Sequence, residues 1–216
     1  MKLEHVKPAE IEGRSFEIIT KELNEMGIKL DDVQSPFVKR CIHTSADFDY
    51  AQSLKFSDGA VDKLKELIRS GAHIVTDTSM AYSGINKSEL GKYGGEAHCY
   101  ISDTDISIAA KVSGVTRSSL CMKKGMSLEG PVIFVVGNAP TALVTIREEW
   151  DAGRYTPAFV IGVPVGFVNV VAAKEMIMET DIPFIVNAGR KGGSNIAAAL
   201  VNAALYELRK DANQLV

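Results

Sequence analysis

The feature that most constrains the fold is an uninterrupted apolar run, Val132-Ile133-Phe134-Val135-Val136. A strand with one solvated face alternates apolar and polar residues, because its two faces meet different surroundings. This run has no polar position, so a strand here needs cover on both faces, as in a parallel sheet flanked by helices. The run therefore predicts an α/β fold in which it forms an inner strand.

Further short apolar runs alternate with helical patterns from about residue 50 onward. We expect strands at Ser53–Phe56, His73–Asp77, Ala97–Ile101, Val132–Gly137, Ala158–Val163 and Phe184–Asn187. Helices are expected at Asp58–Ser70, with Ser57 as its cap, and at Ala139–Trp150 and Asn195–Lys210. The helical spacing of Phe16, Ile19, Leu23 and Met26 predicts an earlier helix that ends at Gly27.

Composition narrows the class of protein. The 216 residues are 46% hydrophobic and 24% charged, which is ordinary for a globular chain, and we expect one domain over residues 1–216. The formal net charge of -3 and the lack of a basic stripe argue against a nucleic-acid partner. The sequence has no apolar signal core at its amino terminus and no run of about 18 apolar residues, so we expect a cytoplasmic protein without a membrane partner.

The spacing of cysteine and histidine argues against a disulfide framework or a metal centre. The three cysteines are odd in number and widely spaced: Cys41, Cys99 and Cys121. The four histidines lack the spacing of metal ligands: His5, His43, His73 and His98. We therefore expect no bound metal and interpret His73, which opens a predicted strand, as structural.

Three loops that follow predicted strands have unusual content: Gly137–Leu143, Gly162–Val168 and Gly189–Asn195. In an open parallel sheet, ligands bind at the carboxyl ends of the strands. Pro140 in a first helical turn suggests backbone N–H groups that are free to face a bound anion. One such loop alone is equally well a tight strand-to-helix turn. Three at one edge predict a binding rim.

The sequence also indicates what this rim binds. Neither G-x-G-x-x-G after a strand nor G-x-x-x-x-G-K-[ST] occurs, so a nucleotide is disfavoured and we expect no cofactor. The cations Arg40, Arg117, Arg190 and Lys191 would suit a ligand that carries several carboxylates, although isolated arginines are also common on solvated surfaces. A G-x-S-x-G nucleophile elbow is missing as well.

The segment Arg40–Tyr50 combines a cation, an imidazole, hydroxyls and carboxylates. His43 can give and take protons near neutrality, because the ordinary pKa of histidine is about 6.5. Arg40 stays charged and can hold a carboxylate in two-point geometry. The segment predicts an acid/base site if it faces a cleft. The alternative is that residues 40–43 end a helix whose dipole stabilises these cations.

Five blocks resemble the signatures of the precorrin-8X and cobalt-precorrin-8 methylmutases of corrinoid biosynthesis. They are Arg14–Ile19, Arg40–Tyr50, Gly137–Leu143, Pro164–Val168 and Gly189–Asn195, in the same order and at matching intervals over almost the whole chain. The stretch Asn169–Glu175 departs from the pattern, because that family usually has an acidic residue and a serine before the lysine.

The resemblance implies a flavodoxin-like three-layer α/β/α sandwich around a mainly parallel five- or six-stranded sheet, and a homodimer with sites near the subunit interface. It also implies migration of a methyl group from C11 to C12 of a tetrapyrrole, within one molecule and without S-adenosylmethionine. His43 would donate and accept the proton near the ring C nitrogen, and Ser15 and Arg40 would bind substrate. To these we add further substrate-binding candidates: Arg117, Asn138, Thr141, Arg190, Lys191, Gly192, Gly193 and Ser194.

Two other functions stay open at this point, a non-catalytic tetrapyrrole carrier of flavodoxin-like fold and an unrelated small-molecule isomerase. A carrier needs cations and apolar walls but no proton shuttle, so His43 favours catalysis. The blocks Arg40–Tyr50 and Gly189–Asn195 look closer to the anaerobic branch of the family, which favours a substrate that carries cobalt.

Overall fold

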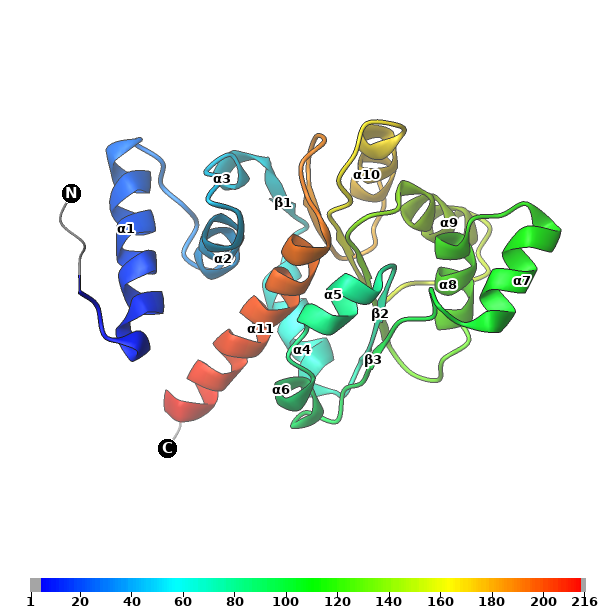
Figure 1. Cartoon of the computed structure of the whole chain (residues 1–216), viewed down its shortest axis with the longest axis horizontal. Coiled ribbons are helices and arrows are strands. Elements are labelled where there is room, and N and C mark those ends of the chain that lie inside the picture. Colours follow the sequence, from blue (N-terminus) through cyan, green and yellow to red (C-terminus); the bar gives the residue numbers. More distant parts are fainter. Residues whose placement is uncertain (1–4, 215–216) are drawn as a thin grey trace.

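A twisted sheet with helices on both faces forms the centre of the molecule, as seen in the computed structural model of residues 5–214 (Figure 1). Residues 1–4, part of the stretch in which we expect no signal core, and residues 215–216 lie outside the described residues. Within residues 5–214 the strands are β1 (Leu54–Phe56), β2 (His73–Thr76), β3 (Ala97–His98), β4 (Val132–Val136), β5 (Phe159–Gly162) and β6 (Phe184–Asn187). Their order is β1-β6-β5-β4-β2-β3, with β1 antiparallel and every other pairing parallel.

The parallel strands follow the flavodoxin-like order 2-1-3-4-5 when they are renumbered from β2. The chain first moves from β2 outward to β3 and then returns to place β4 on the other side of β2. The neighbours β2 and β4 therefore form the topological switch point, where folds of this kind open a crevice at the carboxyl ends of the strands. The predicted fold class is confirmed, with six strands among the described residues.

The described helices fall into two layers. The helices on the side of the first core are η1 (Pro8–Glu10), α1 (Ile11–Glu25), α2 (Ser35–Ser45), α3 (Tyr50–Ser53), α4 (Ala60–Arg69), α5 (Ser79–Gly84), α6 (Lys87–Gly91) and α11 (Ser194–Gln214). The other layer holds α7 (Thr104–Ser113), α8 (Arg117–Gly125), α9 (Pro140–Asp151) and α10 (Val170–Met178). Every helix within residues 5–214 is too short or too polar to cross a bilayer.

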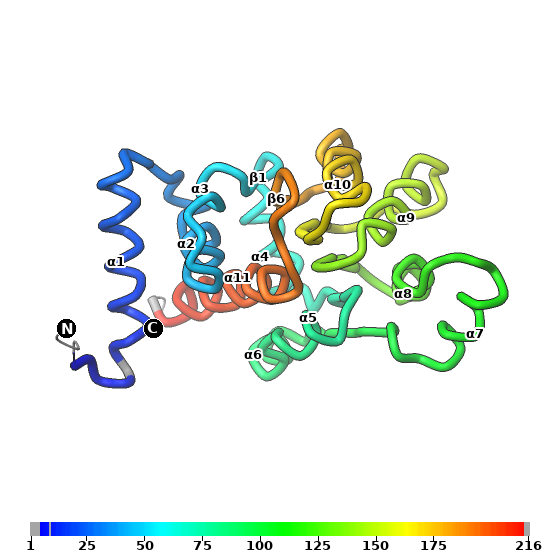
Figure 2. The backbone as a smooth tube through the Cα atoms, turned by 45° about the horizontal axis from the view of Figure 1, so that its top comes forward, coloured from blue at the N-terminus to red at the C-terminus, as the bar shows by residue number. Residues whose placement is uncertain are grey.

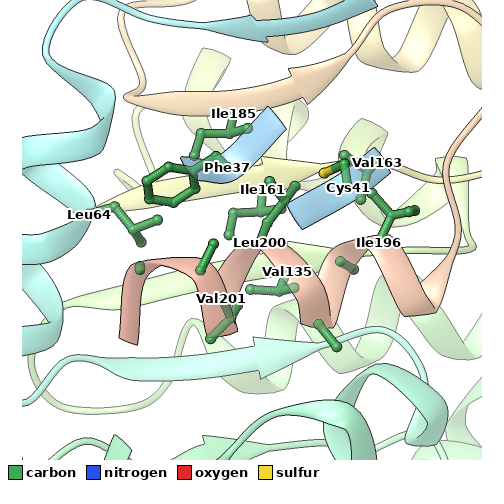
Figure 3. Packing of buried hydrophobic residues seen from close by; sticks show 14 of the residues in the cluster. Phe37, Cys41, Leu64, Val135, Ile161, Val163, Ile185, Ile196, Leu200 and Val201 are labelled. Carbon is green, nitrogen blue, oxygen red and sulfur yellow. The ribbon is translucent and has the colours of Figure 1, made fainter. Parts of the chain in front are cut away.

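Side chains of β4 alternate between the two layers, as the apolar run predicted. Ile133 and Val135 belong to the core under α4 and α11, whereas Phe134 belongs to the core under α8 and α9. Figure 3 shows Val135 packed with Leu200 of α11 in the first of these cores. Both faces of the strand are thus dry, and all five residues of β4 are buried.

Helix α2 packs on α11, and α1 packs on α2 at one end of the molecule, with α7 at the opposite end (Figures 1 and 2). The helix α2 was not predicted as an element, although the alternative interpretation of residues 40–43 as a helix end is correct. It ends at Ser45, and the next residue, Ala46, has a left-handed φ of 55°. This arrangement places His43 in the last turn of α2.

Two expectations about local structure are wrong. Ser57 does not cap the helix after it, because its hydroxyl accepts a hydrogen bond from the N–H of Phe184 at 2.9 Å. Gly59, with φ 65°, precedes α4 instead. The predicted strand Ala97–Ile101 is only two residues long, because its pairing with β2 ends at His98 and the chain turns at Ile101. The other predicted strands and helices are present, with ends that agree or differ by at most four residues.

Candidate active site

Phe16 joins the two helices that carry the predicted acid/base residues. Its ring lies 5.3 Å from the ring of His43 and 4.7 Å from the guanidinium carbon of Arg40, measured from the ring centroid. Ser15 precedes Phe16 on α1, and its hydroxyl donates to the carbonyl of Ile11 at 2.9 Å. The side chain of His43 is exposed. Packing of α1 on α2 therefore brings Ser15, Arg40 and His43 to one region of the surface.

Arg40 is held on three sides. Its guanidinium lies between the rings of Phe16 and Tyr206, at 4.7 and 4.8 Å from their centroids, and the side chain as a whole is 17% exposed. It also donates to the carboxylate of Glu12, and this hydrogen bond holds the pKa of Glu12 below its ordinary value. Beside these groups is a groove of about 440 Å³ between α1, α2 and α11. A ligand carboxylate that approaches Arg40 would compete with Glu12 for the guanidinium.

Lys191 connects the segment after α2 to the last rim loop. Its ammonium donates to the carboxylates of Asp47, at 2.6 Å, and Asp49. The hydrogen bond from Lys191 holds the pKa of Asp47 below its ordinary value. Two of the predicted functional blocks thus meet in space, although 144 residues separate Asp47 from Lys191 in the sequence. The charge of Lys191 is already balanced by these two carboxylates.

The three predicted rim loops do meet at the carboxyl edge of the sheet. The N–H of Gly193 donates to the carbonyl of Val163 at 2.9 Å, and the N–H of Gly166 donates to the carbonyl of Arg190 at 3.2 Å. A Cβ at Gly192 would lie 2.1 Å from the carbonyl oxygen of Val163, so only glycine permits this approach. Arg190 extends over the exposed ring of Phe167, 5.5 Å from its centroid.

Asp77 occupies the switch point between β2 and β4, and its role was not predicted from the sequence. Its buried carboxylate accepts hydrogen bonds from the N–H groups of Gly137, Asn138 and Ala139 at 2.8, 2.8 and 2.7 Å. Burial raises the pKa of Asp77, and the three donors oppose this rise. The expectation that these N–H groups face a bound anion is wrong, because the protein supplies the anion itself. The available signal was a lone carboxylate at the end of an apolar strand.

The structure also places the remaining predicted residues. Ser194 is buried at the start of α11, and its hydroxyl lies 2.8 Å from that of Thr78. Thr141 is exposed at the start of α9 and lies 2.9 Å from the hydroxyl of Thr116. Asn138, whose backbone N–H donates to Asp77, is exposed. Arg117 begins α8, which covers the opposite face of the sheet from α2, so one chain does not bring Arg117 beside His43.

Lys174 donates hydrogen bonds to the backbone of the last rim loop. It was not among the predicted site residues. Its fully buried ammonium donates to the carbonyls of Gly189 and Lys191, both at 2.8 Å. Burial lowers the pKa of Lys174 to about 8. This lysine lies in the stretch Asn169–Glu175 that departs from the family pattern, and Asn169 before α10 has a left-handed φ of 58°. The departure leaves the lysine's contact with the loop in place.

Comparisons with known proteins decide which family these features belong to. A family model described as precorrin-8X methylmutase (CbiC) matches residues 10–207. The chain belongs to the precorrin-8X methylmutase family. A cobalt-precorrin-8 methylmutase of Priestia megaterium is 43% identical over 92% of this chain and 87% of its own length. One from Salmonella typhimurium strain LT2 is 43% identical over 94% of this chain and 97% of its own length.

A solved structure supports the same membership for the fold. The crystal structure of precorrin-8X methylmutase from Thermus thermophilus superposes with a TM-score of 0.82 and is 35% identical, covering 94% of this chain and 98% of that one. The methylmutase fold therefore extends over nearly all of the chain, and the blocks that suggested it in the sequence lie within the matched residues.

Proposed function

We propose that this methylmutase moves a methyl group from C11 to C12 of cobalt-precorrin-8, with His43 as the proton donor and acceptor. The observation that carries the proposal is the exposed imidazole of His43, held against Phe16 in a chain whose family match spans residues 10–207. A passive carrier of flavodoxin-like fold would need no such group, and the family match disfavours that reading.

The chemistry requires positioning and one proton. A methyl group that migrates within one molecule needs no external donor, so the protein has to hold the macrocycle in the reactive conformation and protonate the ring system. An imidazole is suited to this step, because it changes its charge near neutral pH. The exposed position of His43 allows contact with a large ligand that rests on the outer face of α2.

Carboxylates of the substrate would be bound by cations around His43. Arg190 is exposed beside Phe167, which offers a charge and an apolar surface together. Arg40 would bind a carboxylate by exchanging it for Glu12, with its guanidinium already held in place between two rings. Such an exchange would replace the single contact of Arg40 Nη1 with Glu12 by the two-point geometry of the fork, and it adds little entropy loss because the guanidinium is already held.

The cobalt-carrying substrate, the cytoplasmic location, the single domain and the homodimer are parts of the same proposal. Both relatives described above are named cobalt-precorrin-8 methylmutases, which supports the cobalt form. A homodimer with sites near the interface is supported by the positions of α2 and α8 on opposite faces of one sheet, because a second subunit would let both contribute to one ligand.

The test compares the absorption spectra of cobalt-precorrin-8 and of metal-free precorrin-8 after incubation with the protein. Methyl migration changes the conjugated system, whereas passive binding only perturbs its spectrum. His43→Ala should lose about 10²- to 10⁴-fold in turnover and keep its affinity. His5→Ala, the same change at another exposed histidine, serves as the control.

Near-normal turnover by His43→Ala would remove this residue from the mechanism. A spectrum that shifts on binding but does not develop with time in the unmodified protein would favour the carrier. Loss of folding in His43→Ala, checked by circular dichroism, would support the reading in which residues 40–43 only end a helix.

A further inference from the structure

Two histidines far from the candidate active site lie side by side. The ring nitrogens His73 Nδ1 and His98 Nε2 are 3.0 Å apart, and the ring centroids are separated by 5.0 Å. The carboxylate oxygen of Glu96 lies 3.9 Å from His98 Nε2. One ligand atom from each of the three residues falls within 4.8 Å of the others. The histidine spacing in the sequence did not indicate this cluster, because a parallel strand pairing brings the two rings together.

From these contacts we propose that His73, Glu96 and His98 bind one divalent transition-metal ion of the zinc class. Two imidazoles and a carboxylate are a donor set that suits Zn²⁺ and its neighbours and that Mg²⁺ and Ca²⁺ do not prefer. Around a tetrahedral ion with metal–nitrogen bonds of about 2.0–2.1 Å, neighbouring ligand atoms lie about 3.3 Å apart. The two ring nitrogens are already close to this separation.

The surroundings allow an ion to enter without rearranging the fold. The His98 side chain is 19% exposed, and its ring stacks on Tyr100 at 5.9 Å with an angle of 19° between the planes. An ion would replace the hydrogen bond that now joins the two histidine rings. The Glu96 side chain is 71% exposed and can rotate to close its longer contact. A water molecule would complete the coordination, because the described residues offer three protein ligands here.

The position of the cluster suggests what the ion would do. His73 begins β2 and His98 ends the two-residue edge strand β3, which pairs with β2 in parallel. Asp77, at the switch point, follows His73 by four residues, or roughly 13 Å at a rise of about 3.3 Å per residue. The ion would therefore tie a short edge strand to the sheet and would lie apart from the substrate rim.

Isothermal titration of the metal-free full-length protein with Zn²⁺ tests the proposal. We expect one Zn²⁺ per chain, and a melting temperature that rises with Zn²⁺ because the ion binds the folded state. Loss of even an outer-shell partner weakens metal sites by about 10- to 100-fold, so His98→Gln and His73→Gln should weaken binding at least tenfold. Glu96→Gln is the third variant, and it leaves the packing intact because the side chain is exposed.

Two further measurements distinguish a metal site at these three residues from a hydrogen-bonded pair of histidines. Co²⁺ in place of Zn²⁺ should give the intense visible absorption of a four-coordinate ion, and His98→Gln should abolish it. His43→Ala, an exposed histidine in α2, should bind Zn²⁺ as the unmodified protein does. The proposal is overturned if Zn²⁺ does not bind, if the three variants bind it unchanged, or if folded His98→Gln shows the same Co²⁺ spectrum. Those results would leave only a hydrogen-bonded pair of histidines.

Discussion

Raising the pH from 7.5 to 9.5 is expected to stabilise the protein by about 2 kcal/mol relative to a Lys174→Met variant. The ammonium of Lys174 is fully buried and has two carbonyl acceptors, from Gly189 and Lys191. Burial disfavours the charged form, which lowers the pKa of Lys174 from 10.5 to about 8 in the folded protein.

The sign follows from proton counting. Between pH 8 and 10.5 the unfolded chain keeps a proton on Lys174 that the folded protein has released, so stability rises with pH through this window. At about 1.36 kcal/mol for each pKa unit, the full shift corresponds to about 3 kcal/mol. Roughly 2 kcal/mol of this falls between pH 7.5 and 9.5, because the last unit of the window lies above that range.

Urea unfolding followed by circular dichroism at pH 7.5, 8.5 and 9.5 measures the effect. Burial also raises the pKa of Tyr50 and Cys121 to about 12, so these groups add their own pH dependence to stability. Both proteins contain them, and their effect cancels in the difference. The loss of the lysine donor from two carbonyls changes the free energy of unfolding of Lys174→Met by the same amount at every pH. It therefore does not affect how the difference between the two proteins changes with pH. Lys29→Met, at an exposed lysine, is the control. A pH-independent difference between wild type and Lys174→Met would refute the reasoning.

Three further changes probe the site. Gly192→Ala should destabilise the protein by about 1–3 kcal/mol more than Gly189→Ala in urea unfolding. A Cβ at Gly192 would clash with a carbonyl, whereas no described atom lies within 4 Å of a Cβ at Gly189. Equal losses of stability in the two variants would contradict this reasoning. Asp77→Ala leaves three N–H groups without their acceptor and should cost about 3–5 kcal/mol by the same assay, and a loss below 1 kcal/mol would show that water replaces the carboxylate. Glu12→Gln should lower the KM by up to about fivefold if Arg40 must leave Glu12 to bind substrate, whereas an unchanged or higher KM would make Arg40 structural.

The elements of the sheet could be predicted because their signals are local. The apolar run at β4 needs dry surroundings on both faces whatever its neighbours are, and glycines such as Gly27 and Gly153 end helices through their own left-handed φ values of 70° and 63°. The rim was predictable too, because the carboxyl ends of parallel strands lie at one edge. The short β3 was overestimated, since its pattern does not show where the pairing with β2 ends.

The sequence by itself thus determined the α/β class, the edge that carries the rim and the residue types of the acid/base segment. Only the tertiary structure decided which charges are already paired. Arg40 meets Glu12 across 28 residues, Asp77 meets the backbone of Gly137 across 60, and Lys191 meets Asp47 across 144. Local patterns fix the conformation of a segment, but a partner distant in sequence is set by how packed helices and strands cross, and that geometry has no periodic signal along the chain.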